Sequence, residues 1–165
     1  MLMNTTEGIS VKSSYLSFLL DKGIFAINVS KVLEVLEKQP ITFVPDTPKH
    51  IVGVLNFRGE ILPVIEMRLK FNMPSGNLEK FVIIVLELMI NGKPQIFGAI
   101  VDSVVDVIEI YNNTIKSVPE MGSNFNPEYI SGMIKSDKGF IMFLNIDKVF
   151  SHDEIKLIIN ENLKQ

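Results

Sequence analysis

Glu34 and Asp106 are the two carboxylates whose pairing could most readily support acid–base chemistry. Two carboxylates in one site can act as general acid and general base when their surroundings separate their pKa values. These two residues, however, occupy equivalent positions in an internal repeat of the chain. A pair that a repeat dictates is more typical of a structural feature than of a catalytic one, so we predict no catalytic residue.

The histidines His50 and His152 do not form a recognisable metal site. The chain has no cysteine, and neither histidine has a carboxylate at ligand spacing, although zinc sites are built from such groups. The glycine patterns that mark nucleophile elbows, phosphate loops and dinucleotide folds are also missing from the sequence. We therefore expect no metal and no cofactor.

Arg58 is a residue that its local turn does not require. It lies in the hairpin tip at residues 56–59, whereas the equivalent tip of the second half, residues 135–139, contains no arginine. A planar guanidinium anchors protein contacts better than an ammonium group does. Two interpretations are open, a solvated turn residue or a residue of a protein interface.

An internal repeat positions these residues. The segment 25–35 returns as segment 97–107, an offset of 72. Three further segments return in the same order: 41–45 as 115–119, 47–53 as 126–132, and 59–66 as 139–147. Four matches in register indicate a duplicated structural unit. What the copies share is interpreted as fold, and what only one copy has becomes a candidate for function.

Short apolar or β-branched runs bounded by turn residues predict strands. The runs are 15–20, 24–27, 51–55, 61–65, 81–86, 96–101 and 140–144. Asn91-Gly92 predicts a type I′ hairpin, while Gly23 and Gly139 are expected to adopt positive φ in three-residue hairpin loops. Many runs lack alternation, which indicates strands covered on both faces. The sequence therefore predicts a mostly β fold of two small barrels side by side.

Helix is expected only in short pieces and at the C-terminus. Valines spaced three apart beside Asn28 and Asp102 predict one short helical turn in each half. Residues 151–165 begin with a capping box and continue with apolar residues on one face, which predicts a helix. We expect a mobile tail at 1–13 and a domain at 14–150, with halves at about 14–72 and 78–150. The repeat leaves open whether the halves exchange strands.

Composition excludes several classes of protein. The chain has 165 residues, 47% of them hydrophobic, and a formal net charge of −3, so no basic stripe points to nucleic acid. The longest apolar run, residues 81–90, is about half of the roughly 20 residues that span a bilayer. The N-terminus has no signal-peptide pattern. The absence of cysteine fits a reducing cytoplasm.

Residues 52–65 read Val-Gly-Val-Leu-Asn-Phe-Arg-Gly-Glu-Ile-Leu-Pro-Val-Ile. This segment resembles the hallmark segment of CheW-type chemotaxis coupling proteins, whose usual core is Asn-Leu-Arg-Gly. Phe57 replaces the leucine. Segments 31–35, 98–107 and 146–149 match as well, so the resemblance covers nearly all of residues 15–150.

The resemblance implies two five-stranded, SH3-like β-barrel halves that share a groove, followed by a C-terminal helix. It also implies a non-catalytic adaptor in the cytoplasm that is recruited to membrane receptor arrays. One partner would be the regulatory domain of the histidine kinase CheA, which docks barrel against barrel. The other would be the helical cytoplasmic tip of a methyl-accepting chemotaxis receptor.

By the same resemblance, the receptor helix would lie in the groove between the halves, a helix-in-groove mode of recognition. The residues implied to contact it are Leu16, Val29, Val32, Val35 and Val104, with Glu34 and Arg58 as polar determinants. Ordinary core positions remain equally open for the valines. Gly53, Asn56 and Gly59 are expected to shape the hairpin.

Two alternatives remain at this point. A CheW-like scaffold of another chemosensory pathway, such as surface motility, would use the same barrel face. From a different class comes a small-ligand sensor or hydrolase that uses the groove carboxylates Glu34, Asp102 and Asp106.

Overall fold

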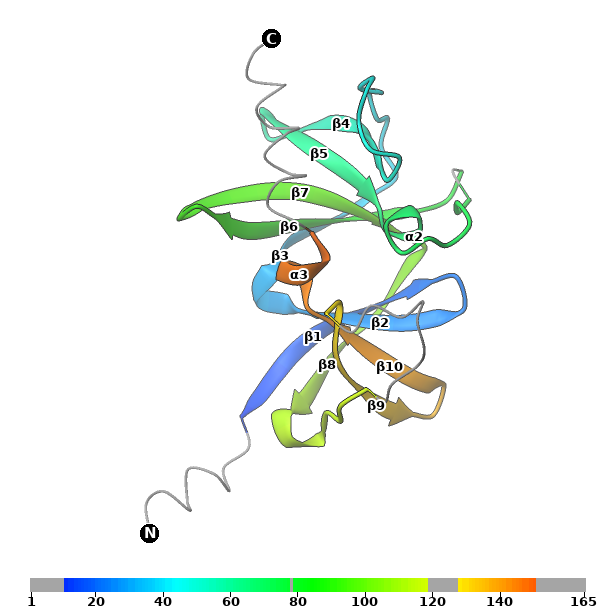
Figure 1. The fold of residues 1–165 in the computed structure, drawn as a ribbon, viewed down its shortest axis with the longest axis vertical. Coiled ribbons are helices and arrows are strands. Elements are labelled where there is room, and N and C mark those ends of the chain that lie inside the picture. The colour runs from blue at the N-terminus through cyan, green and yellow to red at the C-terminus, as the bar shows by residue number, and fades with distance from the viewer. Residues whose placement is uncertain (1–10, 78, 119–127, 151–165) are drawn as a thin grey trace.

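The computed structural model describes residues 11–77, 79–118 and 128–150, which consist mainly of β-strands (Figure 1). The strands of the first half are β1 (Lys12–Leu20), β2 (Gly23–Asn28), β3 (Val32–Glu37), β4 (Ile51–Phe57) and β5 (Glu60–Glu66). Those of the second half are β6 (Val82–Ile90), β7 (Lys93–Val101), β8 (Ser103–Tyr111), β9 (Ile130–Ser136) and β10 (Gly139–Leu144). Short helices are η1 (Val29–Lys31), α2 (Met67–Lys70), η2 (Asn112–Thr114) and α3 (Ile146–Val149).

The two halves exchange strands. One five-stranded sheet has the order β8-β1-β2-β10-β9, and the other has the order β3-β6-β7-β5-β4. Each sheet therefore combines the first two strands of one half with the last three strands of the other. The exchange creates one parallel pair in each sheet, β2 with β10 and β5 with β7. The predicted mostly β fold, with two five-stranded units related by the repeat, is confirmed.

Each sheet is closed by a segment that follows its edge strand. Thr42, beyond β3, forms two backbone hydrogen bonds of 2.8 Å with Val54 on β4. Lys116, beyond β8, forms two bonds of 2.9 Å with Met133 on β9 in the same manner. Because each closing segment pairs with the far edge of its own sheet, both units become small barrels.

Three apolar cores explain why the strands lack alternation. The largest core lies between the barrels and includes Leu16 and Ile27 from one sheet and Ile84 and Phe97 from the other. Each barrel also has a smaller core of its own. Strands such as β6 contribute to both kinds of core, so successive side chains are buried on opposite faces.

The turns agree with the sequence in part. Asn91 and Gly92 have φ of 54° and 77°, the type I′ geometry that the pair predicts, and Gly139 has φ of 115°. The expectation for Gly23 is wrong, because Asp21 takes the left-handed position of that turn with φ of 55°. Aspartate tolerates this conformation, and the Asp21 N–H donates a 2.8 Å bond to the Asp102 carboxylate.

Of the two expected helical turns, only one forms. η1 forms as predicted, with the Asn28 side chain accepting a bond from the Ser30 N–H. The prediction of a second helical turn is wrong, because Asp102 is a single residue between β7 and β8. Its N–H donates to the carbonyl of Leu19 at 3.0 Å. β1 begins at Lys12. The helix predicted at residues 151–165, which contains His152, lies outside the described residues.

Candidate partner-binding surface

Arg58 occupies a backbone position that disfavours arginine. Arg58 and Gly59 form the two-residue turn between β4 and β5 with φ of 53° and 84°, and the Asn56 side chain accepts the Gly59 N–H at 2.9 Å. Turns of this type favour asparagine or glycine, and the left-handed conformation costs most other residues about 1–2 kcal/mol. An arginine that tolerates this cost, with its side chain 68% exposed, indicates a role for the guanidinium.

The guanidinium of Arg58 is directed by two neighbours. Its Nη2 forms an ion pair with Oε1 of Glu34 on β3, and its Cζ lies 4.8 Å from the ring centroid of Phe57. An exposed pair of this kind contributes at most about 1 kcal/mol to stability. Its main effect is to hold the charged tip of the β4–β5 turn against the edge strand β3.

A β-bulge re-aims side chains on the edge strand of each sheet. The pairing of β3 with β6 shifts between Val32 and Glu34, and the pairing of β8 with β1 shifts between Val104 and Asp106. The extra residues at these bulges, Leu33 and Val105, are 46% and 38% exposed. A bulge lets residues three apart share a face, so Val32 and Val35 point to the same side of their sheet.

The bulges give each edge strand an apolar strip, the β3 strip (Leu33 and Val35) and the β8 strip (Val105 and Val107). Val35 lies opposite the fully buried Ile84, and Val107 lies opposite Leu16, which is 6% exposed. Ile84 and Leu16 both belong to the core between the barrels. The strips therefore extend the apolar core between the barrels to the protein surface at two equivalent places, where Val35 is 43% and Val107 is 56% exposed.

The residues expected to contact a partner are placed in three layers. Val35 and Arg58 are exposed and Glu34 is partly buried beside them. Val29, Val32 and Val104 are half-buried and pack against the core between the barrels. Leu16 is a member of that core.

Val107 is a surface residue that the sequence reasoning missed. It is the repeat equivalent of Val35, and the segments 25–35 and 97–107 end on these two residues. The repeat could therefore have identified it once Val35 was considered.

The residues expected to shape the hairpin lie in two places. Asn56 and Gly59 are in the β4–β5 turn itself. Gly53 lies near the start of β4, away from the turn, where a Cβ atom would stand 2.1 Å from the carbonyl oxygen of Thr42. Gly53 therefore permits the close approach that shuts the barrel.

The three carboxylates of the ligand-site alternative have separate partners. Glu34 is paired with Arg58, Asp102 with Arg68, and Asp106 accepts the N–H of its neighbour Val107 at 2.8 Å. No group of three or more potential metal ligands occurs in the described ranges.

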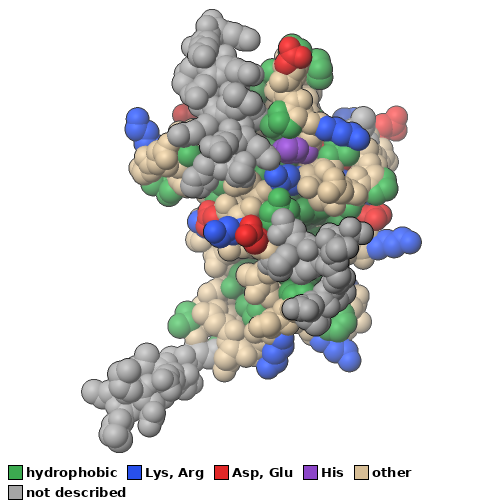
Figure 2. Space-filling view, in the orientation of Figure 1, with side chains coloured by type: hydrophobic (Ala, Val, Ile, Leu, Met, Phe, Trp, Pro, Cys, Tyr) green, Lys and Arg blue, Asp and Glu red, His purple; other side chains and the backbone are tan. Residues whose placement is uncertain are grey.

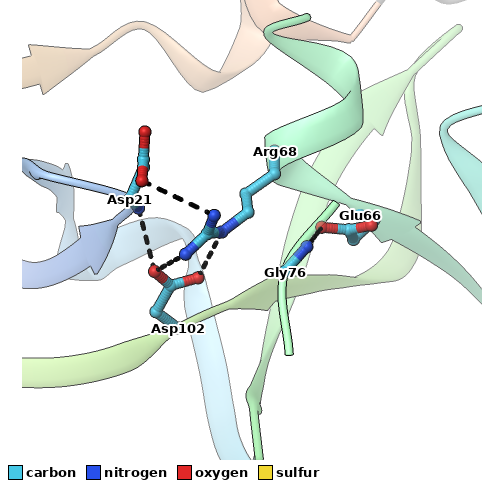
Figure 3. A network of polar contacts seen from close by, with 5 residues as sticks. All are labelled: Asp21, Glu66, Arg68, Gly76 and Asp102. Carbon is cyan, nitrogen blue, oxygen red and sulfur yellow. Dashed lines mark hydrogen bonds and ion pairs between the residues drawn. The ribbon is translucent and has the colours of Figure 1, made fainter. Parts of the chain in front are cut away.

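Arg68 forms a polar cluster that sequence reasoning did not find (Figure 3). Its Nε donates to Oδ1 of Asp102 at 2.8 Å, its Nη2 donates to Oδ2, and its Nη1 lies 3.7 Å from Oδ1 of Asp21. The hydrogen bond to Asp102 raises the pKa of Arg68. In sequence Arg68 stands between Glu66 and Lys70 and resembles an ordinary solvated charge, so nothing local distinguished it.

The surface carries no large patch of one charge in the view of Figure 2, where basic and acidic side chains are interspersed. None of the helices within the described ranges is long and apolar enough to span a membrane.

Comparison with known proteins agrees with this architecture. A model of the CheW-like domain family matches residues 14–154. Chemotaxis protein CheW of Klebsiella aerogenes is 28% identical over 153 residues, which cover 93% of this chain and 90% of that protein. Chemotaxis protein CheW of Thermotoga maritima is 30% identical over 141 residues, covering 86% of this chain and 89% of that protein.

The fold comparison points the same way. The crystal structure of scaffolding protein TtCheW from Thermoanaerobacter tengcongensis matches with a TM-score of 0.74 and 30% identity, covering 87% of this chain and 91% of that chain. The chain belongs to the CheW-like family, which is a family of non-catalytic chemotaxis coupling adaptors.

Proposed function

We propose that this protein couples methyl-accepting chemotaxis receptors to the histidine kinase CheA, without catalysing a reaction. It would hold the cytoplasmic tip of a receptor and the regulatory domain of the kinase at the same time. The observation that carries the proposal is Arg58, an exposed arginine kept in a left-handed turn position beside an apolar strip. Residues of this kind mark contact sites rather than stable turns.

The receptor side of the proposal uses the strips and Arg58. A receptor helix presents apolar side chains on one face, which would pack on the β3 strip and the β8 strip. The half-buried valines Val29, Val32 and Val104 would form the floor beneath it. Arg58, held by Glu34, would supply the polar anchor at the edge of this contact.

The kinase side uses other surface. Large apolar side chains outside the strips are exposed on both barrels: Phe43 (74%) and Ile61 (57%) on one, and Phe140 (56%) on the other. They offer contact area for a second β-barrel domain. A standard interface buries roughly 800 Å² per partner, and modest contacts suffice when an array multiplies them. The adaptor would act in the cytoplasm, at receptor arrays.

The test separates the two partners. Arg58→Ala and Val35→Glu are expected to weaken capture of a receptor-tip fragment while capture of the kinase regulatory domain and the thermal melt stay unchanged. Wild-type binding of both partners by both variants would remove this surface from the receptor interface.

Control measurements address the alternatives. A large thermal shift with a small metabolite, in the absence of partners, would favour a ligand sensor. A scaffold of another chemosensory pathway would use the same surface, and the proteins that co-purify with the chain identify the pathway.

A further inference from the structure

We propose that Arg68 is a positioning residue that fixes the β8 strip relative to the β3 strip, and thereby sets the shape of the partner-binding surface. The inference rests on the proposed function, because it names what holds that surface in register. Arg68 itself lies in the cluster with Asp102 and Asp21, with its side chain 17% exposed, and would not touch the partner.

Arg68 joins one barrel to the other. It belongs to α2, which directly follows β5 of the sheet β3-β6-β7-β5-β4. Its guanidinium bonds twice to Asp102, the residue at which the chain leaves that sheet, and reaches Asp21 in the β1–β2 turn of the other sheet. Asp21 in turn donates its N–H to the same Asp102 carboxylate.

The cluster fixes the start of β8. Asp102 directly precedes β8, and its N–H is bonded to the carbonyl of Leu19 on β1. The bulge residue Val105 follows three residues later, and the whole β8 strip lies within five residues of Asp102. A displacement of Asp102 would therefore be passed to the strip through a short length of strand.

The guanidinium has little freedom to move. A bidentate arginine–carboxylate pair fixes orientation as well as distance. The loop after α2 folds over it: the Met73 N–H donates to the carbonyl of Arg68 at 2.7 Å, and a Cβ atom on Gly76 would stand 3.0 Å from Arg68 Nε.

That loop is itself anchored. Glu66 is 2% exposed and accepts bonds from the Ser75 hydroxyl at 3.1 Å and from the Gly76 N–H at 3.4 Å, as the close-up of Figure 3 shows for Gly76. The segment that joins the two halves of the chain is thus packed against the same cluster.

The test uses Arg68→Met and Arg68→Lys, with Lys148→Met as the matched control. Lys148 lies in α3, the equivalent helix, and is exposed, so its replacement removes one positive charge without touching the cluster. Affinity for a receptor-tip fragment and for the kinase regulatory domain is measured for each variant, together with a thermal melt. Because the chain has no cysteine, Glu37→Cys on β3 and Glu109→Cys on β8 also allow paired spin labels to report the distance between the edge strands.

The expected result is a loss of about tenfold or more in receptor affinity for Arg68→Met, with kinase-domain affinity within about twofold of wild type. Arg68→Lys should fall between, because a lysine keeps the charge but lacks the fork. The distance distribution between the labels should broaden in Arg68→Met and stay unchanged in Lys148→Met.

Two outcomes would overturn the inference. One is a folded Arg68→Met protein with wild-type receptor affinity and label distances. The other is parallel loss of both partners and of folding in both Arg68 variants, which would make the residue merely structural. If instead wild type fails to bind the receptor fragment while the label distances still respond to Arg68→Met, the proposed function fails and the positioning role stands.

Discussion

Arg68 and Asp147 are the second residues of the short helices that follow the fifth strand of each half, and they carry opposite charges. Each forms an ion pair with the segment where the chain crosses between barrels, Arg68 with Asp102 and Asp147 with Lys31. The pairing survives the duplication although the charges are reversed. Its position in the fold, rather than the identity of either residue, is therefore what the two halves share.

We expect Arg58→Asn to separate stability from binding. Asparagine relieves the left-handed strain of about 1–2 kcal/mol, which offsets the loss of an exposed ion pair worth at most about 1 kcal/mol. The free energy of unfolding should stay within about 1 kcal/mol of wild type or rise, while receptor binding falls about tenfold or more. Urea unfolding and a binding titration check both parts, and a marked loss of stability would show that the turn needs its arginine.

The predicted contact residues should divide into core and surface. Leu16→Ala is expected to cost about 2–4 kcal/mol of stability, because it leaves a cavity in the core between the barrels. Chemical denaturation measures this cost. A stable Leu16→Ala protein with weakened receptor binding would instead place Leu16 at the interface.

Val107→Glu should have the opposite effect to Leu16→Ala, because it should weaken receptor binding and leave stability nearly unchanged. The side chain is 56% exposed, so stability should change by about 0.5 kcal/mol or less, while receptor binding falls as it does for Val35→Glu. Parallel binding titrations of the two glutamate variants test the equivalence of the strips. Undiminished binding by Val107→Glu alone would confine the interface to β3.

Much of the fold was readable because the repeat and the turn residues are local signals. Asn91-Gly92 and Gly139 fix their hairpins through backbone conformations that few other residues adopt. The exchange of strands could not be predicted from the sequence. Apolar runs such as those of β3 and β8 have a composition that suits pairing with strands of either half. Only the packing of the complete chain decides between the two arrangements.

Site residues could be predicted from the sequence where a residue type in one half has no counterpart in the other. Arg58 stood out because the second turn has no arginine, whereas Val107 was missed although it is the repeat equivalent of Val35. Arg68 was missed for another reason, since its partner Asp102 lies 34 residues away and the two meet only when β5 pairs with β7. The error at Gly23 has the same origin: the distant carboxylate of Asp102 stabilises Asp21 in the left-handed position.

Barrel closure predicts an unequal response of two glycines to alanine. At Gly53 a Cβ atom would clash with the carbonyl of Thr42 at 2.1 Å, so Gly53→Ala should cost about 2 kcal/mol or more. Gly92 has φ of 77° and open space around it, so Gly92→Ala should cost about 1 kcal/mol through backbone conformation alone. Equal losses in urea unfolding would mean that the closing segment yields to the added methyl group.

The two ion pairs at the crossings should differ in strength. Lys31 and Asp147 are 3.3 Å apart with side chains 33% and 53% exposed, so Lys31→Met should change stability by about 0.5 kcal/mol or less. Arg68 and Asp102 are 17% and 26% exposed and doubly bonded, so Arg68→Met strands a partly buried carboxylate and should cost about 2 kcal/mol. Urea unfolding at low salt and at 1 M NaCl tests the difference, because salt screens the more exposed pair more strongly than the partly buried one. A cost for Lys31→Met that equals the cost for Arg68→Met would show that both crossings hold the barrels together equally.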